Sequence, residues 1–399
     1  MLPRVKITYS NGALGQVAEM DDGCLGFIAI GAAEVAGEEN FKLGKAYSLK
    51  KLADLESLGV TSENNPNLYR NVKDFYAEGG DGLELWLMGF AETAAFATVL
   101  DKDNAGGAKS LLLSAKGNIR GLIAFKTPGE SYELDDSEGM DSDVIAALPK
   151  AQALGEWATD DRYAPIFTLI EGYAYSGNDT GLPDLKTMNH DRCGIVIGDT
   201  SQDSPNAAMG IVAGRIAATD VQRKISRVKS GALTPVEMFV GGKTVEEADV
   251  ESINDKGYIT FRTFVGKSGY FIADDPLATA ATDDYNSLSN RRVIDKAYRI
   301  AYNTLVESLN DEVPIATDGT LSPAWCASVQ GDVEQAIISS MTANGNLGND
   351  PADPDDTGVE CSIDYKQDIL ATSRIAAGLR VKPNGYAKYI DFDLGFKTT

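Results

Sequence analysis

The clearest alternation of hydrophobic and polar residues lies near the C-terminal end of the chain. Apolar Ile390, Phe392, Leu394 and Phe396 are separated by acidic or small residues, which is the period of a half-buried β-strand. This pattern predicts a strand at the C-terminal end.

The N-terminal end repeats this period. Val5, Ile7 and Tyr9 share one face, and the other face carries the basic residues Arg4 and Lys6. Terminal segments usually fray unless they pair with something, so two strong strand patterns at the ends imply a sheet that receives them. That sheet belongs either to the same chain or to a neighbouring molecule, and the pattern alone leaves both open.

Between the two ends, apolar runs alternate with amphipathic segments. We expect buried strands at 24–30, 83–88, 118–125, 166–171 and 193–198, and helices at 48–58, 66–78, 141–159 and 206–217. A strand–helix–helix–strand order is typical of a parallel sheet with helices on its faces. The larger part of the chain is therefore predicted to be an α/β fold.

The last third changes character. It contains two amphipathic helical patterns, at 288–310 and 323–341, followed by extended segments at 360–365 and 369–381 and then the terminal strand. This order predicts an α+β domain after the α/β domain. A length of 399 residues agrees with two or more domains.

The composition argues against several classes of function. The net charge of −23 opposes binding to phosphate backbones or anionic lipid, so we expect no direct nucleic-acid contact. No apolar run approaches the ~20 residues of a membrane span, and the first ten residues lack a secretory signal, so we expect no membrane insertion and synthesis in a cytosol. The four cysteines are far apart and form no CxxC pair, which fits reduced core residues.

The sequence contains few candidate catalytic or phosphate-binding motifs. The lone histidine, His190, has no motif-framed serine or cysteine partner. The glycine-lysine-hydroxyl triplets at 242–244 and 266–268 lack the earlier glycine of a phosphate-binding loop, and we expect hairpin turns at both.

An acidic string precedes the helix at 141–159. It is a candidate metal site, but it fits better a solvated loop running into a helix N-terminus, where acids suit the helix dipole. A cytosolic α/β enzyme that uses only carboxylates, our alternative function, would depend on this string. We otherwise expect no catalytic residue, cofactor or metal. The string comprises Asp135, Asp136, Glu138, Asp141 and Asp143.

Several blocks, in order, resemble the contractile tail sheath proteins of phages and related injection machines. They are residues 48–59, 68–88, 210–217, 253–258, 266–271, 289–294 and 368–392. After Gly269 the family commonly has a tryptophan-glycine and arginine-threonine stretch, whereas residues 272–277 read Ile-Ala-Asp-Asp-Pro-Leu. We therefore expect a divergent branch of Mu-like or Bacteroidetes-phage type.

The resemblance implies a subunit that stacks in sixfold rings around an inner tube and exchanges terminal strands with its neighbours. Implied partners are further copies of the chain, the tail-tube protein, and the baseplate and tail terminator proteins. Assembly would occur in the host bacterial cytoplasm, before incorporation into a virion tail or injection particle. The implied domains are an N-terminal arm (1–20), an outer α/β domain (21–272, loop-rich at 91–188), an inner α+β domain (273–382) and a C-terminal strand arm (383–399).

A basic cluster occupies the first half of the helix at 288–310. Arg291, Arg292, Lys296 and Arg299 concentrate positive charge in a strongly acidic chain. This cluster is a candidate contact for an acidic inner tube. Local ion pairing with nearby acids explains it equally well.

Overall fold

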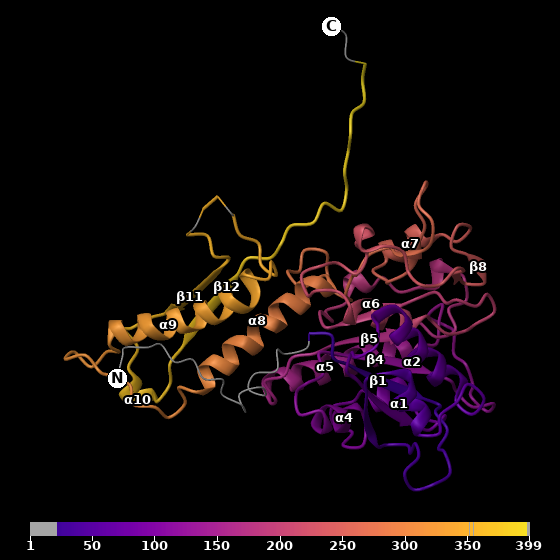
Figure 1. Ribbon diagram of the computed structural model, residues 1–399, viewed down its shortest axis with the longest axis horizontal. Helices are drawn as coiled ribbons and strands as arrows, with labels where there is room; N and C mark the ends of the chain where they lie inside the picture. Colours follow the sequence, from indigo (N-terminus) through magenta and orange to yellow (C-terminus); the bar gives the residue numbers. More distant parts are fainter. Residues whose placement is uncertain (1–21, 351, 354, 397–399) are drawn as a thin grey trace, which may run out of the picture.

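A computed structural model describes residues 22–350, 352–353 and 355–396. Its largest element is a six-stranded sheet of order β2-β3-β1-β4-β5-β6, in which β2 is antiparallel to β3 and the other pairs are parallel (Figure 1). The strands are β1 Leu25–Ile30, β2 Ala46–Leu49, β3 Leu85–Phe90, β4 Gly121–Lys126, β5 Phe167–Glu171 and β6 Cys193–Val196.

The predicted strands are present because their apolar runs are covered on both faces. Every residue of β1, β4 and β5 is buried, as expected for parallel strands between helical layers. The edge strand β2 was not predicted. Ser48, the first residue of the helix predicted at 48–58, lies in β2 instead. The helix begins at Leu52 because the Asp54 carboxylate accepts hydrogen bonds from the backbone N–H groups of Lys50 and Lys51.

Helices cover both faces of the sheet. In the sheet order, β3 lies on one side of β1, and β4 and β5 lie on the other side. The connection from β1 to β3 therefore crosses the sheet in one direction, and the connections from β3 to β4 and from β4 to β5 cross it in the other direction. Because such crossovers are right-handed, their helices lie on opposite faces. Helices α2 and α6 pack closely, and a Cβ on Gly210 would lie 2.2 Å from the Asn71 carbonyl oxygen. The helices are α1 Leu52–Ser57, α2 Pro66–Gly79, α3 Phe96–Val99, α4 Ala108–Ser114, α5 Ser142–Asp160, α6 Met209–Ala217 and α7 Val250–Asp255.

Several short strands and 3-10 helices also belong to this sheet region. Gly241 and Gly242, with φ of 57° and 77°, form the two-residue turn between β7 and β8, so the triplet at 242–244 is part of a hairpin, as predicted. The triplet at 266–268 lies in the connection between β9 and β10, which also pair as a hairpin. These elements are β7 Phe239–Val240, β8 Lys243–Thr244, β9 Phe261–Arg262, β10 Phe271–Ile272, η1 Asp179–Gly181, η2 Leu185–Thr187 and η3 Val228–Ser230.

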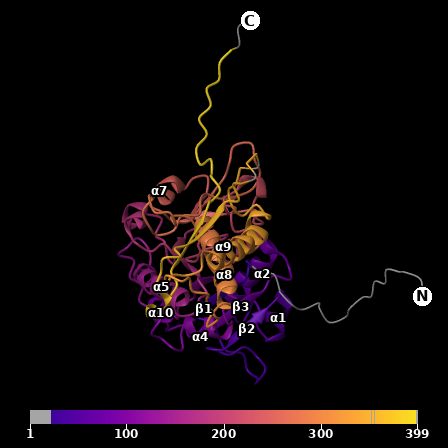
Figure 2. The ribbon, with the colours of Figure 1, turned by 90° about the vertical axis from the view of Figure 1, so that its left-hand side faces the viewer.

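The last third forms a helix–hairpin region, lying to one side of the sheet and facing the viewer in Figure 2. Helix α9 packs on α8 and on the antiparallel pair β11–β12, around two small hydrophobic clusters separate from the main core. The segment at 369–381, predicted to be extended, begins with a helical turn that ends at Ser373, where φ is 49°. The elements are α8 Leu288–Val306, α9 Pro323–Ile337, the π-helical turn η4 Ile338–Thr342, β11 Val359–Ile363, α10 Ile369–Thr372 and β12 Ala377–Val381.

Candidate functional site

The C-terminal stretch, residues 389–396, leaves the body of the molecule as an extended segment (Figures 1 and 2). Ile390, Phe392 and Leu394 are 80–85% exposed, and Phe396 is fully exposed. Across the described part of the chain, no strand pairing or hydrogen bond involves this stretch. The alternation is thus present, but the predicted strand has no partner among the residues 22–350, 352–353 and 355–396 that the structure describes.

A row of exposed apolar side chains is unusual for a soluble monomer and indicates a surface that another molecule covers. The matching residues at the other end, Val5, Ile7 and Tyr9, lie outside the described residues.

The root of the C-terminal stretch is held against the sheet region. Lys388 Nζ lies 2.5 Å from Asp274 Oδ2, and Lys224 Nζ lies 2.9 Å from Asp274 Oδ1. Burial disfavours the Asp274 carboxylate, but the two ammonium groups outweigh burial and lower its pKa to about 2. The Tyr386 hydroxyl donates to the Gln222 carbonyl. The chain is therefore held as far as Lys388, and residues 389–396 make no such contact with the other described residues.

The basic cluster of α8 faces inward. Arg291, Arg292 and Arg299 are each at most 6% exposed, and Lys296 is half-buried. Arg292 donates to the Thr219 carbonyl at 2.8 Å, and Lys296 Nζ lies 2.6 Å from Asp22 Oδ2.

Desolvation lowers the pKa of Arg292 to about 10 and that of Arg299 to about 9. Arg299 donates to the Pro165 carbonyl. Lys296 thus pairs with an acid, as the local explanation expects, whereas Arg292 and Arg299 donate to main-chain carbonyls. Contact of this cluster with an inner tube stays a prediction.

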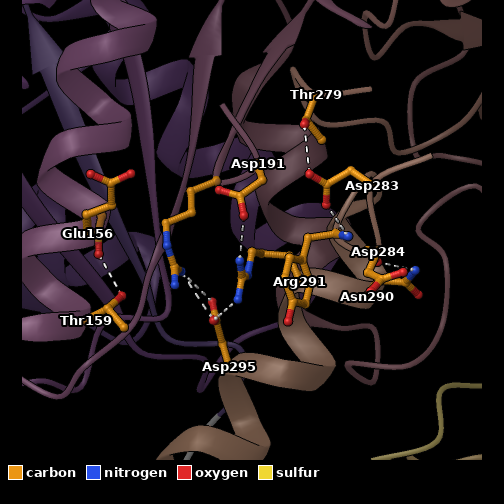
Figure 3. Close-up of polar contacts among 12 residues, drawn as sticks. Glu156, Thr159, Asp191, Thr279, Asp283, Asp284, Asn290, Arg291 and Asp295 are labelled. Carbon is orange, nitrogen blue, oxygen red and sulfur yellow. Dashed lines mark hydrogen bonds and ion pairs between the residues drawn. The ribbon is translucent and has the colours of Figure 1, made fainter. Parts of the chain in front are cut away.

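An ion-pair network, only part of which the sequence suggested, joins α8 to the sheet region. Arg291 reaches Asp191 at 3.2 Å and Asp295 at 3.0 Å, and Figure 3 shows Arg291 pointing toward both acids. Asp295 also pairs with Arg192. Nearby, the rings of Tyr163 and Tyr302 stack with centroids 4.7 Å apart.

Asp191 and Arg192 are 100 or more residues from their partners in sequence. No local pattern could have identified these pairs.

The acidic string divides between surface and core. Asp141 is the N-cap of α5 and accepts a hydrogen bond from the Asp143 N–H. Both acids contact the buried ammonium of Lys126 at the end of β4, Asp143 at 3.2 Å. Burial disfavours the Lys126 ammonium, but hydrogen bonds to Asp141 and Tyr132 and the two carboxylate charges outweigh burial and raise its pKa. The other acids are exposed or half-exposed: Asp135, Asp136 and Glu138.

Two of the five carboxylates on which the enzyme alternative depended, Asp141 and Asp143, are thus occupied in capping α5 and holding Lys126. Among the residues that the structure describes, no group of three or more His, Cys, Asp or Glu side chains is arranged to hold a metal ion. No described helix is long and apolar enough to cross a membrane.

Solved structures share this fold over nearly the whole chain. A chain of the anti-feeding prophage (AFP) baseplate aligns with a TM-score of 0.64 at 14% identity, covering 100% of this chain and 99% of that one. A chain of the PVC sheath complex in the contracted state aligns with a TM-score of 0.61 at 14% identity, covering 100% of this chain and 98% of that one. A chain of the AFP baseplate in the contracted state aligns with a TM-score of 0.62 at 14% identity, covering 99% of each chain. No curated protein matches the sequence.

The fold is therefore that of contractile injection system sheath and baseplate chains, and the resemblance to the tail sheath family is confirmed. Two family models match the sequence directly: DUF2586, N-terminal domain, over residues 2–276, and DUF2586, C-terminal domain, over residues 284–399. The chain belongs to the DUF2586 family.

Proposed function

We propose that this protein is the structural sheath subunit of a contractile phage tail or related injection system. It polymerises as stacked sixfold rings around an inner tube, and contraction drives the tube through a target envelope. The observation that carries the proposal is the exposed apolar C-terminal stretch, residues 389–396, which has the alternation of a strand and pairs with no other described segment of its own chain.

Strand addition accounts for this stretch. An extended segment that joins the sheet of a neighbour forms main-chain hydrogen bonds along its length and buries alternate side chains. Because the stretch is fixed at Lys388, each copy offers its strand from a defined point. A donor and an acceptor on one chain give a head-to-tail contact, which closes into rings or continues as a helical filament.

The sheet region (21–272, with its loop-rich part at 91–188) forms the outer domain, and residues 273–382 form the inner domain beside the tube. The arms at 1–20 and 383–399 connect copies. The lateral position of the helix–hairpin region supports this radial order (Figure 1). The inner tube, the baseplate and the tail terminator are the further partners. Assembly takes place in the bacterial cytoplasm, and the mature sheath is part of a virion tail or injection particle.

Contraction in this account uses stored packing energy. The extended lattice is a metastable arrangement, and rings relax in succession to one that buries more surface. The subunit therefore needs no catalytic centre. The engagement of Asp141 and Asp143 with Lys126 agrees with a structural role for these carboxylates.

Sedimentation velocity of the purified full-length chain tests the proposal. A sheath subunit forms very large, polydisperse species whose fraction rises with protein concentration. A carboxylate enzyme would sediment as a monomer or a small closed oligomer at every concentration, and that result would contradict the proposal.

A further inference from the structure

A pocket of about 240 Å³, which we call the α4–α5 pocket, lies at the end of the sheet region where β4 and β5 begin. Its walls come from the C-terminal ends of α4 and α5, both labelled in Figure 1, and from the residues that lead into the two strands. A cavity of about 150 Å³ with apolar walls accommodates a benzene molecule, so this pocket has room for one apolar side chain of a partner. The large apolar side chains that line it are Leu112, Leu113, Ile119, Trp157 and Ile166.

The rim of the α4–α5 pocket is cationic. Lys116 and Arg162 line the pocket and are exposed. The Trp157 ring is contacted by two cations, with Lys109 Nζ 4.7 Å and the Arg162 guanidinium carbon 5.3 Å from its centroid. None of these three cations forms an ion pair with a described residue, although exposed aspartates at 160–161 directly precede Arg162. A partner that suits this pocket is therefore apolar at its centre and acidic around it.

The acidic loop, residues 132–138, has this composition. Leu134 is 48% exposed, and its neighbours Glu133, Asp135 and Asp136 are exposed acids. The loop carries no lysine or arginine. It therefore offers one apolar side chain surrounded by negative charge.

The acidic loop is held on both sides of Leu134. Before it, the Tyr132 hydroxyl accepts a hydrogen bond from Lys126 Nζ at 2.9 Å. After it, the Asp135 carbonyl accepts from the Ser142 N–H at 2.8 Å. Because these contacts already order the loop, docking of Leu134 costs little further conformational entropy.

We propose that the acidic loop of one copy docks into the α4–α5 pocket of a second copy, with Leu134 in the pocket and its acidic neighbours beside Lys116 and Arg162. This inference rests on the proposed sheath function and adds a contact between the sheet regions of neighbouring copies. Burial of one leucine is too small a gain to hold two copies together. The contact therefore adds to the exchange of terminal strands and does not replace it.

The second copy, rather than the same chain, supplies the loop. The acidic loop is held by Lys126, the last residue of β4, whereas Ile119 and Ile166 of the pocket precede β4 and β5. The loop and the pocket therefore lie at opposite ends of the sheet, about 20 Å apart along a strand of this length. A contact between two different surfaces is head-to-tail and can repeat from copy to copy, as a ring or a helical lattice requires.

A competing occupant is Leu309, which is 68% exposed and lies near Glu307 and Asp311. The described hydrogen bonds of residues 307–312 reach no farther than three positions along the chain. The acidic loop, which is held from both β4 and α5, is therefore the better ordered partner before binding.

Disulfide trapping between two differently labelled full-length chains tests the proposal. One chain carries Leu113→Cys at the exposed rim of the pocket, and the other carries Glu133→Cys or Asp135→Cys, on either side of Leu134. A disulfide requires Cα atoms within about 7 Å, which docking of the loop brings about. We expect a covalent heterodimer on mild oxidation of the assembled mixture. The four native cysteines are buried, which limits background.

The matched control places the first cysteine at Ser114, the next residue of α4, which is exposed but does not line the pocket. Successive helical side chains project about 100° apart around the axis, so this thiol points away from the docked loop. We therefore expect about tenfold less heterodimer with Ser114→Cys.

Charge exchange provides a second measurement, with Asp135→Cys as the loop thiol. Lys116→Glu with Arg162→Glu in the pocket chain should lower trapping about tenfold, because like charges then meet. Glu133→Lys with Asp136→Lys in the loop chain should restore it. All four residues are exposed, so the variants should stay folded, which thermal unfolding checks.

Several results would overturn the inference while leaving the sheath function intact. They are equal trapping at Leu113→Cys and Ser114→Cys, preferential trapping of the pocket by Ser308→Cys or Asp391→Cys, unchanged trapping after charge reversal, and large assemblies that form without trapping at the pocket. Failure of the unmodified chain to assemble would overturn the proposed function itself.

Discussion

Asp295 of α8 and Arg192, which directly precedes β6, form a buried ion pair with Arg192 Nη1 3.2 Å from Asp295 Oδ1. Arg291, one turn earlier in α8, shares the same carboxylate at 3.0 Å. The exposed fractions of these three side chains are between 4% and 9%. Asp295 thus pairs with two cations where the helix–hairpin region meets the sheet region, and Asp191 gives Arg291 a second acidic partner. Together these pairs fix the orientation of α8.

Asp295→Ala should destabilise the subunit by about 3–5 kcal/mol, because it leaves buried Arg192 without its acidic partner and leaves Arg291 paired with Asp191 alone. Urea unfolding measures the change, using a chain shortened after Lys388 so that assembly does not intervene. Asp284→Ala is the control, since Asp284 is exposed, and its effect should stay within about 0.5 kcal/mol. A loss below about 1 kcal/mol for Asp295→Ala would show that the network is not structural.

Reversing Arg292 and Lys296 to Glu decides between tube contact and local pairing. A buried glutamate at 292 and a glutamate beside Asp22 at 296 should prevent stable folding, so that polymerisation and tube binding fail together. Circular dichroism and co-sedimentation with the tube protein measure the two properties. A folded variant that still polymerises but no longer binds the tube would instead assign these residues to the tube interface.

Glu171 at the end of β5 should make stability depend on pH. Burial outweighs the hydrogen bonds from the Lys126 and Ala207 N–H groups and raises its pKa from 4.5 to about 7. The folded state then binds a proton that the unfolded state has lost, so stability falls as pH rises from about 4.5 to about 7.

Thermal unfolding of the shortened chain should show this loss, which amounts to as much as about 3 kcal/mol, and Glu171→Gln should remove this part of the pH dependence. Equal pH dependence in both proteins would contradict the assignment.

Two side chains of α9 hydrogen-bond to the edge of β11: Glu334 Oε1 accepts from the Cys361 N–H, and Gln330 Nε2 donates to the Cys361 carbonyl, each at 2.7 Å. These bonds predict a local effect on amide exchange. Glu334→Ala combined with Gln330→Ala should accelerate amide exchange at Cys361 about tenfold or more, because hydrogen bonds to charged groups contribute about 1.5–3 kcal/mol. Hydrogen exchange with mass spectrometry measures it, and Glu360→Ala, whose side chain is exposed on the same strand, is the control. Unchanged exchange at Cys361 in the double variant would mean that the α9 side chains do not protect this edge.

Much of the sheet region could be predicted from the sequence. Strands β1, β4 and β5 are continuous apolar runs, and Pro66 and Asp141 mark helix starts, so short-range patterns suffice for these elements. Strand β2 was missed because four residues at a sheet edge have no distinctive period. The ion-pair network between α8 and the sheet region was only partly predictable. Arg192 and Asp295 are 103 positions apart, and each looks like an ordinary surface residue in its local sequence.

The C-terminal stretch shows a second limit of predicting structure from the sequence. Its alternation was identified correctly, but a strand exists only beside another strand, and the described chain offers no partner for residues 389–396. In the proposed assembly the sequence pattern describes a property of several chains together, and it could not by itself say which chain completes the sheet.

Negative-stain imaging of the full-length chain beside a chain lacking residues 389–399 tests the central claim most directly. Residues 389–396 make no described contact with the body, so the shortened chain should remain folded, with a melting temperature within about 2 °C of the full-length value. The account predicts long cylinders for the full-length protein and dispersed single subunits for the shortened one. Cylinders formed equally well without the stretch, or a shortened chain that is unfolded, would contradict it.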